Sequence, residues 1–452
     1  MNPIIEETIR NFDVGLYRPI KPRMLDLGRP LEPRAGNLVK VITGMRRSGK
    51  SYRLYQEMEA LHAGGVPWER ILYFNFEDER LAPVTSSVGD EVLETFQSLH
   101  PKAFEEGVYL FFDELQEMEG WGAWMRRVVD TKRATIYVTG SSSKMLSAEI
   151  ASEFRGRAVD FELLPLSFGE FLSFNDVLDS PSSRASFSTA ERLAVRSAFG
   201  RFLQEGGFPA AQGLSRQEAI PLLQSYAQRV VARDVIERHG ISRPGVAVAF
   251  AQRVLGTNAR QLSIRKVVND LKSAGISTSR ELLADILRYF EEAYLAFAVK
   301  EFSLSLAEGS TSSPKLYAVD PGLALANSKA GTNDAGQRLE NAIYLELRRR
   351  ERGMRKDAVS SYRTKGRGLE VDFVAGDVLD GRPRKFYQVC ETVRDEDTLK
   401  RELRALWEAL AESGVEEGLL IVGDGEEKTY EQDGKTVRQI PAWKWLLTEE
   451  TE

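Results

Sequence analysis

The sequence predicts an α/β fold that begins with a doubly wound, parallel sheet. Four apolar runs of strand length, 38–42, 70–76, 108–112 and 135–138, alternate with stretches of helical spacing. That alternation is typical of a parallel sheet with helices on both faces. A glycine-containing turn follows the first run, and two carboxylates follow the third. Because ligands bind at the carboxyl ends of parallel strands, both features mark a predicted site.

Length and composition are those of a multidomain globular protein. The chain has 452 residues, of which 42% are hydrophobic and 28% charged, so we expect two to four domains of about 100–200 residues. One cysteine excludes an intramolecular disulfide, and three histidines leave little scope for a structural zinc site. The formal charge of −6 argues against a uniformly basic surface, although local patches remain compatible with phosphate binding.

The sequence predicts no contact with a membrane. No apolar run approaches the ~20 residues that cross a bilayer. The start, MNPIIEETIR, lacks the basic and apolar segments of a signal peptide. We therefore expect a soluble, cytoplasmic protein.

The turn after the first strand, GMRRSGKS at 44–51, has the GxxxxGK[ST] pattern of a phosphate-binding loop (P-loop). Glycines let successive backbone N–H groups converge on phosphate oxygens, and the following helix adds its positive end. Lys50 is expected to reach the β- and γ-phosphates and Ser51 to bind Mg²⁺, so the predicted cofactors are ATP and Mg²⁺. The predicted nucleotide-binding residues of this segment are Gly44, Met45, Arg46, Arg47, Ser48, Gly49, Lys50, Ser51 and Tyr52.

Two carboxylates follow the third predicted strand, in the segment VYLFFDELQ. Asp113 ends that strand, where it is expected to hold Mg²⁺ through its water shell. Glu114 is the candidate catalytic base for the attacking water. The fourth strand ends in TGSSS, and a hydroxyl of Thr139, Ser141 or Ser142 is a candidate sensor of the γ-phosphate. Small polar residues after a strand also form ordinary turns, which is the alternative.

The motifs occur in the order GMRRSGKS, ILYFNFED, LFFDELQ with Trp121 and Trp124, TGSSS, FRGR, LPLSFGEF and GGFP. This series resembles that of AAA-superfamily P-loop ATPases of bacteria and archaea that carry a C-terminal restriction-nuclease-like domain. The resemblance covers roughly residues 35 to 425. It implies that the P-loop lysine and serine hold phosphate and magnesium, that the two carboxylates form the second acidic motif, and that Ser141 or a neighbour is the sensor.

The resemblance also assigns a role to FRGR, which contains Arg155 and Arg157. In related ring ATPases an arginine at this place reaches the γ-phosphate held by the next subunit. An arginine supplied in trans neutralises charge on the transferring phosphoryl group and can raise hydrolysis ~10³–10⁵-fold. The expected assembly is therefore a ring, with a hexamer favoured and Arg157 the preferred finger. The alternative is an exposed arginine pair at a helix end.

The predicted domains combine these patterns with the resemblance. They are an N-terminal segment at 1–34, the AAA-type core at 35–167, a helical lid at 168–244, a winged-helix domain at 245–328, a restriction-nuclease-like domain at 329–447 and a tail at 448–452. The lid is the part that closes over nucleotide in such ATPases.

The winged helix is predicted from three helical runs, 246–256, 264–274 and 278–293, and two extended segments, 295–302 and 315–319. The third helix of such a domain can enter a DNA groove. The basic groups available are Arg265, Lys266, Lys272, Arg280 and Arg288. The third helix also carries four acids, so contact with protein alone is the alternative.

The C-terminal domain follows the order of restriction-type metal nucleases (the PD-(D/E)xK layout): a helix, a hairpin with LEVDFV and a strand, KFYQVCET. Such nucleases need two or three carboxylates for Mg²⁺ and a lysine. Glu340 and Asp372 match, whereas Gln388 replaces an acid and Cys390 replaces the lysine. Glutamine is a poor ligand for a hard cation and a thiol lacks the charge, so the predicted site is degenerate.

Two further features of this domain bear on its role. The basic run RRRERGMRK at 348–356, continued by Arg363, Lys365 and Arg367, is a candidate DNA contact or a solubilising helix end. A helix is expected at 399–412, and the last strand of the sheet at 418–422.

The function predicted from these features is that of an ATP-hydrolysing motor or remodeller that grips duplex or branched DNA with its winged-helix and C-terminal domains. One alternative is a nucleotide-dependent switch that binds protein partners in signalling or defence. The other is an ATP-gated, Mg²⁺-dependent nuclease.

Overall fold

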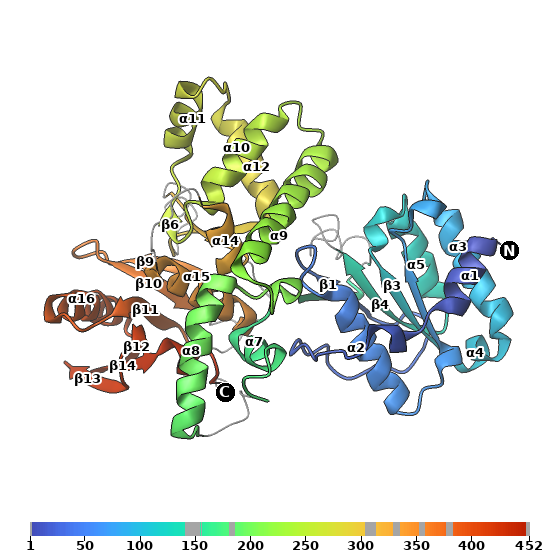
Figure 1. Cartoon of the computed structure of the whole chain (residues 1–452), viewed down its shortest axis with the longest axis horizontal. Coiled ribbons are helices and arrows are strands. Elements are labelled where there is room, and N and C mark those ends of the chain that lie inside the picture. Colours follow the sequence, from blue (N-terminus) through green and yellow to red (C-terminus); the bar gives the residue numbers. More distant parts are fainter. Residues whose placement is uncertain are drawn as a thin grey trace. The chain divides into compact units, whose positions relative to one another are not determined.

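The computed structural model describes residues 2–140, 154, 156–179, 186–302, 313–328, 335–351, 358–376 and 383–448. The chain divides into two compact units, Met1–Leu163 and Leu164–Glu452, and each is described by itself. Figure 1 labels most of the helices and strands of both units.

The first unit contains the predicted parallel sheet. Its strands are β1 (Val39–Thr43), β2 (Ile71–Asn75), β3 (Val108–Asp113), β4 (Ala134–Gly140) and β5 (Ala158–Glu162). The strand order is β2-β3-β4-β1-β5, and every pairing is parallel. The prediction of a parallel sheet is therefore confirmed, and β1 lies between the central strand β4 and the edge strand β5.

Two hydrophobic clusters cover the two faces of this sheet. Phe112 belongs to the cluster that includes α3 (Ser86–Leu99) and α5 (Trp121–Thr131). Its neighbour Phe111 belongs to the cluster that includes α2 (Lys50–Ala63), because successive strand residues point to opposite faces. Each fully buried phenylalanine stabilises the fold by ~1.5–3 kcal/mol. The short helix α4 (Pro101–Glu106) leads into β3.

The N-terminal segment packs against the same unit. Helix α1 (Pro3–Asn11) contacts α3 and β2. A short 3₁₀ turn, η1 (Val14–Tyr17), follows it. Arg23 is buried, and its guanidinium donates a hydrogen bond to the backbone oxygen of Ser48 in the P-loop. The N-terminal segment therefore contacts the P-loop directly through the Arg23 guanidinium.

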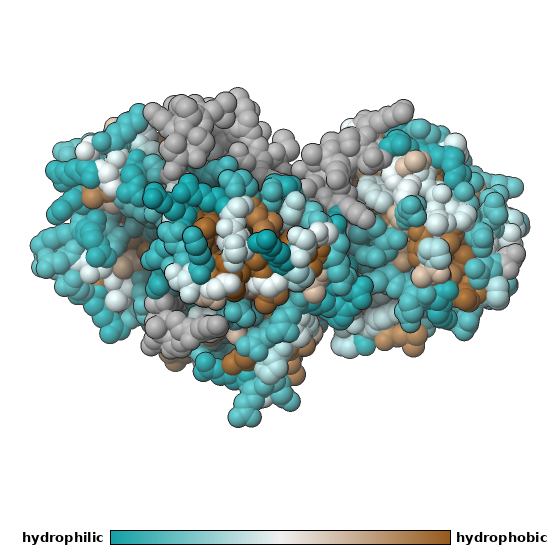
Figure 2. Space-filling model, turned by 90° about the horizontal axis from the view of Figure 1, so that it is seen from above, coloured by the Kyte–Doolittle hydropathy of each residue, from teal (hydrophilic) through white to brown (hydrophobic). Residues whose placement is uncertain are grey.

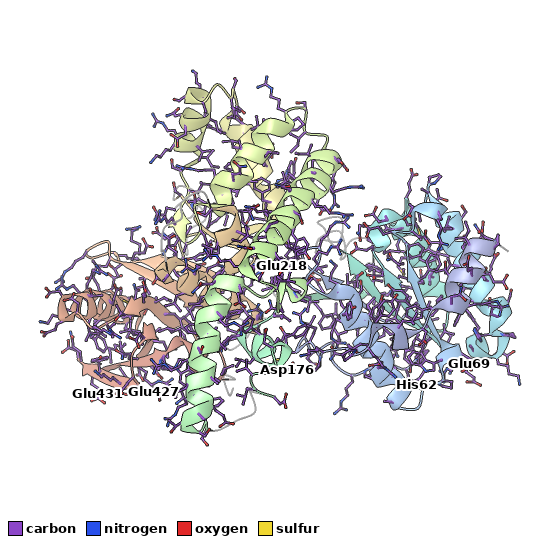
Figure 3. All side chains as sticks on the ribbon, in the orientation of Figure 1. His62, Glu69, Asp176, Glu218, Glu427 and Glu431 are labelled. Atoms are coloured by element: carbon purple, nitrogen blue, oxygen red, sulfur yellow. The ribbon has the colours of Figure 1, made fainter. Side chains whose placement is uncertain are left out.

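The second unit begins with α7 (Phe168–Phe174), α8 (Thr189–Glu205) and α9 (Arg216–Arg229), which continues as a π-helical segment, η8 (Val230–Glu237). Capping boxes start α8 and α9, and Glu218, labelled in Figure 3, closes the second. Both helices pack against α14 (Pro321–Asn327). These are the residues of the predicted lid, and that role stays a prediction.

Three helices and three short strands follow. They are α10 (Pro244–Leu255), β6 (Arg260–Gln261), α11 (Ile264–Ser273), α12 (Arg280–Glu292), β7 (Ala296–Val299) and β8 (Lys315–Ala318). The strands form an antiparallel sheet in the order β6-β8-β7. All three predicted helices and both extended segments are present, whereas β6 has too few residues to give an alternating signal in the sequence.

The C-terminal elements form a larger mixed sheet. They are α15 (Ala335–Arg350), β9 (Val359–Arg363), β10 (Glu370–Ala375), β11 (Lys385–Thr392), α16 (Glu396–Ser413), β12 (Glu417–Asp424), β13 (Lys428–Gln432), β14 (Lys435–Pro441) and α17 (Ala442–Trp445). The strand order is β13-β14-β12-β11-β10-β9.

The prediction that the strand at 418–422 is the last of this sheet is wrong. Strands β13 and β14 form a hairpin whose turn is Asp433–Gly434, with φ of 49° and 73°. Asp-Gly is a strong signal for such a turn. Both strands are mostly polar and β13 is mostly exposed, so neither has the apolar run by which a buried strand is predicted.

The sheet that contains β7 and β8 is separate from this one, but an isolated bridge between Glu301 and Ser361 and a ring contact to α15 connect the two. The Phe302 N–H donates to the Ser361 carbonyl at 2.7 Å, and Tyr317 stacks on Tyr344 with ring centroids 4.4 Å apart.

Figure 2 shows one face of the molecule, which is mainly hydrophilic, with apolar residues gathered in a few places. Among the described residues, no helix combines the length and the apolar character needed to span a bilayer.

Candidate active site

The P-loop has the backbone conformation that its glycines predict. Gly44, Arg47 and Gly49 have φ of 150°, 71° and 99°. A side chain at Gly44 has no room, because its Cβ would lie 2.2 Å from the Leu163 carbonyl oxygen. Gly49 is the N-cap of α2, and no side chain caps this helix. The first N–H groups of α2 therefore face the loop, which is the arrangement that binds an anion.

Lys50 is buried inside this loop. Its ammonium donates to the carbonyls of Gly44 at 3.1 Å and Met45 at 3.3 Å. The same nitrogen lies 3.7 Å from Oε1 of Glu114. The structure therefore brings the predicted phosphate ligand and the predicted base to the same end of the sheet.

Asp113 is buried at the end of β3 and is surrounded by hydroxyl groups. Tyr73 donates to its carboxylate at 2.8 Å, and Thr139 and Ser51 also donate to it. Burial raises the pKa of Asp113, and the charge of Glu114 raises it further, while the hydroxyl groups act in the opposite direction. The three donors thus offset part of the rise in the pKa of Asp113 that burial causes.

Glu114 has a left-handed backbone, with φ of 49° and ψ of 45°. For a residue other than glycine this conformation is uncommon and costs of order 1–3 kcal/mol. It is held by a hydrogen bond from the Glu114 N–H to the Thr139 hydroxyl at 3.0 Å. The Gln116 amide donates to the Glu114 carboxylate. Thr139 therefore connects the two acids, which is consistent with its place among the candidate sensors.

A cluster of aromatic residues lies behind Asp113, and no local pattern in the sequence predicts it. The Tyr55 hydroxyl donates to the Tyr73 hydroxyl at 3.2 Å. Phe12 stacks on Tyr73 and Tyr17 stacks on Tyr55, each with ring centroids 4.4 Å apart. The cluster joins the N-terminal segment to the carboxylate of Asp113 through one hydroxyl.

The remaining predicted P-loop residues have different surroundings. Met45 is buried, while Tyr52 is 45% exposed on the first turn of α2. The Arg46 guanidinium binds Glu77 at 3.0 Å and Glu117 at 3.4 Å. The predicted sensor at position 141 lies outside the described residues.

The predicted arginine finger is engaged within its own chain. Arg157 forms an ion pair with Asp130 of α5. Its neighbour in the motif, Arg155, lies outside the described residues.

The groups present fit a bound magnesium nucleotide. The hydroxyl of Ser48 is buried in the loop and has no hydrogen-bond partner among the described residues, as expected for a donor reserved for phosphate. Ser51 and Asp113 supply the oxygen ligands that Mg²⁺ prefers. Gly44 leaves the space beside the Ser48 hydroxyl unfilled, because a Cβ at this position would also lie 3.3 Å from that hydroxyl.

The C-terminal site contains a lysine that the sequence did not identify. Lys315, at the start of β8, lies within 3.0 Å of both Glu340 and Asp372. Gln388 donates to Glu402 at 2.7 Å, and the Cys390 thiol donates to the Thr392 carbonyl. The two predicted acids are therefore brought together, with a lysine from another strand between them.

The start of the basic run 348–356 is not a free surface for DNA. Arg348 lies over the ring of Phe297 at 4.1 Å, Arg349 donates to the Pro165 carbonyl at 2.8 Å, and Arg350 donates to the Trp445 carbonyl at 2.7 Å. These three arginines therefore have partners that anchor α15, which favours the alternative of a helix end for them, and the DNA contact of the run stays a prediction. Residues 352–356 lie outside the described residues.

Comparisons with known proteins agree with the nucleotide site. Residues 36–172 match the model of the AAA domain, which supports an ATPase, and residues 196–334 match a domain of unknown function, DUF8612. A solved structure, the Walker-type ATPase PABY2304 of Pyrococcus abyssi, is 15% identical, with a TM-score of 0.42, and covers 64% of this chain and 90% of that one. This score is too low to carry an argument.

Two relatives match over most of their length. An uncharacterized protein of Haemophilus influenzae is 29% identical over 75% of this chain and 80% of its own. The uncharacterized protein MJ1544 of Methanocaldococcus jannaschii is 33% identical over 420 residues, which cover 91% of this chain and 89% of the relative. The chain therefore belongs to the family of MJ1544, and its residues 36–172 form an AAA domain.

Proposed function

We propose that this protein hydrolyses ATP at the P-loop and uses the turnover to act on DNA. The observation that carries the proposal is the meeting of Lys50, Asp113 and Glu114 at one end of the sheet, with the Lys50 ammonium 3.7 Å from the Glu114 carboxylate. The AAA match over residues 36–172 supports the same activity.

Each group has a role that its surroundings favour. In the proposed reaction, Lys50 leaves the loop carbonyls and binds the phosphates, whose negative charge attracts it more strongly. Ser51 and Asp113 hold Mg²⁺, which neutralises charge on the phosphates when bound. Glu114 accepts the proton of the attacking water, and Thr139 keeps its backbone in position through the 3.0 Å hydrogen bond.

The proposed assembly is a ring, with a hexamer favoured. Arg157 then reaches the phosphate of the neighbouring subunit, and it must leave Asp130 to do so. Both side chains of this ion pair are partly exposed, so the cost of opening it is small, about 0–1 kcal/mol. The pair is therefore compatible with a finger that is released on assembly.

The proposed DNA contact is made by α11 in a winged helix. The order helix, strand, two helices and two strands supports that fold. Arg265, Lys266 and Lys272 of α11 are exposed, and no ion pair of theirs is found within the part of the chain that the structure describes. In contrast, Arg288 of α12 is bound by acids of its own helix. The net positive field that DNA needs is therefore on α11 rather than on the third helix.

The test is the ATPase rate with and without DNA. The variant Arg265→Gln/Lys272→Gln removes two cations from α11, and the matched control Lys428→Gln/Lys435→Gln removes two from the β13–β14 hairpin. We expect DNA to raise the ATPase rate of the parent and of the control alike. For the α11 variant, the logarithm of the DNA-binding constant should fall less steeply with the logarithm of salt concentration, with a slope smaller by about 2, or about 1 per lost phosphate contact. Hydrolysis that is indifferent to single-stranded, duplex and four-way DNA would refute the DNA part and favour a switch that binds protein partners.

A further inference from the structure

A buried lysine lies at the centre of the nuclease-like site. The Lys315 ammonium is 2.7 Å from Glu340, 2.9 Å from Glu370 and 3.0 Å from Asp372. Its side chain is only 10% exposed. The three carboxylates come from α15 and β10, whereas the lysine comes from β8. Three oxygens around one small cation at these distances leave no room for a second cation.

The layout of a restriction-type nuclease implies a divalent cation between these acids, and the groups present do not fit one. Oδ1 of Asp372 binds Lys315, and Oδ2 accepts the Val389 N–H at 2.9 Å. The Glu340 oxygen that meets the lysine also accepts the Tyr317 hydroxyl at 2.6 Å. Among the described residues, no group of three or more histidines, cysteines or acids is arranged to hold a metal ion.

Gln388 does not complete a cation site either. Its amide nitrogen donates to Glu402 at 2.7 Å, and its amide oxygen accepts the Asp372 N–H at 3.3 Å. Both ends of the side chain are thus used to hold β10, β11 and α16 together. The position that carries an acid in active nucleases therefore has a packing role in this chain.

We infer that the Lys315 ammonium takes the place of the divalent cation, so that the acid cluster fastens β8 to the C-terminal sheet and does not cut DNA. The same strand is fixed by other contacts: the Asn341 amide donates to the Ala318 carbonyl at 2.9 Å, and Tyr317 stacks on Tyr344. The helices before β8 and the C-terminal sheet are thereby joined through one buried ionic centre.

The charges of the cluster agree with this reading. Three carboxylates surround a single ammonium, so a buried cluster favours the uptake of a proton. Burial, and next the charge of Asp372, raise the pKa of Glu340 to about 8. The lysine and this tendency to take up a proton both offset negative charge in the cluster.

The test measures Mn²⁺ binding to the full chain without nucleotide. The substitution Asp113→Asn in every sample removes the proposed cation ligand near the P-loop. We expect no Mn²⁺ bound at micromolar concentration, by electron paramagnetic resonance, when Lys315 is present. We expect one Mn²⁺ per chain in Lys315→Ala, lost again when Asp372→Asn is added. This inference does not depend on ATP hydrolysis, since neither Lys315 nor Asp372 is among the proposed nucleotide-binding residues.

Four results would each overturn the inference. Mn²⁺ that binds while Lys315 is present and is lost with Asp372→Asn alone would overturn the inference, as would Mn²⁺-dependent cleavage of DNA lost with the same substitution. A folded Lys315→Ala protein that takes up no Mn²⁺ would also overturn it. If Lys315→Ala does not fold, millimolar Mn²⁺ must restore its melting transition, because a ligand bound only by the folded state stabilises that state. Failure to do so contradicts the inference.

Discussion

The hydroxyl of Tyr73 gives the sharpest prediction about the nucleotide site. Tyr73 donates to Asp113 at 2.8 Å from the neighbouring strand, and Asp113 is buried. Replacing Tyr73 by phenylalanine removes this donor and keeps the ring that stacks on Phe12. Burial already raises the pKa of Asp113, and the Tyr73 hydroxyl acts in the opposite direction. Its loss therefore raises this pKa further and leaves the ionised carboxylate that would bind Mg²⁺ less well stabilised.

The size of the effect follows from the hydrogen bond. A hydrogen bond to a charged group contributes ~1.5–3 kcal/mol, and Asp113 keeps two other hydroxyl donors, from Ser51 and Thr139. The lower end of that range is therefore appropriate. Since about 1.4 kcal/mol corresponds to a tenfold change in an equilibrium constant, we expect the Mg²⁺-dependent part of nucleotide affinity to fall about tenfold.

The assay is calorimetric titration with a slowly hydrolysed ATP analogue, once with Mg²⁺ and once with EDTA. Tyr73→Phe should weaken binding about tenfold with Mg²⁺ and leave binding in EDTA unchanged. The matched control is Tyr55→Phe, which removes a hydroxyl from the same cluster, 3.2 Å from Tyr73, and leaves every donor to Asp113 in place. Equal losses in the two variants, or a Tyr73→Phe loss that persists in EDTA, would refute the reasoning.

Three other predictions concern the pH dependence of stability, the assembly of subunits and a steric clash at one glycine. Because the pKa of Glu340 is raised to about 8 in the folded chain, the free energy of unfolding of the parent falls as pH rises from about 4.5 to 8. Glu340→Gln lacks this group, so its melting temperature should rise relative to that of the parent over the same interval. A difference in melting temperature that does not change with pH would contradict this. Arg157→Ala and Glu114→Gln should each lose hydrolysis, and mixing them should recover part of it at interfaces that combine an intact arginine with an intact acid; no recovery would argue against a finger in trans. Gly206 and Gly213 both have positive φ, but of the two only Gly206 has a close neighbour, since its Cβ would lie 2.1 Å from a carboxylate oxygen of Asp320. Gly206→Ala should therefore lower the melting temperature more than Gly213→Ala does. Equal losses in the two variants would contradict the steric argument.

Local patterns predicted the P-loop and the strands around it because their signals lie within a few adjacent residues. The glycines at 44 and 49 and the apolar strand before Asp113 are each readable in this way. The hydrogen bond from Tyr73 to Asp113 was not, because the two residues lie 40 positions apart. Only the pairing of β2 with β3, which aligns Asn75 with Asp113, brings them together.

The lysine of the C-terminal site was also not predicted, because it too is distant in sequence from its partners. Glu340 and Asp372 were found from the order of elements, but the expected place of the lysine is taken by Cys390. Lys315 lies 57 positions before Asp372 and in a strand assigned to another domain. For the basic run at 348–350 the sequence left two alternatives, because sequence alone does not distinguish an exposed arginine from one whose guanidinium binds a backbone carbonyl of its own chain.

The most direct test of the nucleotide site measures ATP binding and ATP turnover side by side in Glu114→Gln. The proposed roles predict that this variant binds ATP and Mg²⁺ as tightly as the parent and no longer hydrolyses the nucleotide, since only the group that accepts the proton of water is lost. Turnover at the rate of the parent would contradict the account, because the base would then lie elsewhere than beside Lys50 and Asp113.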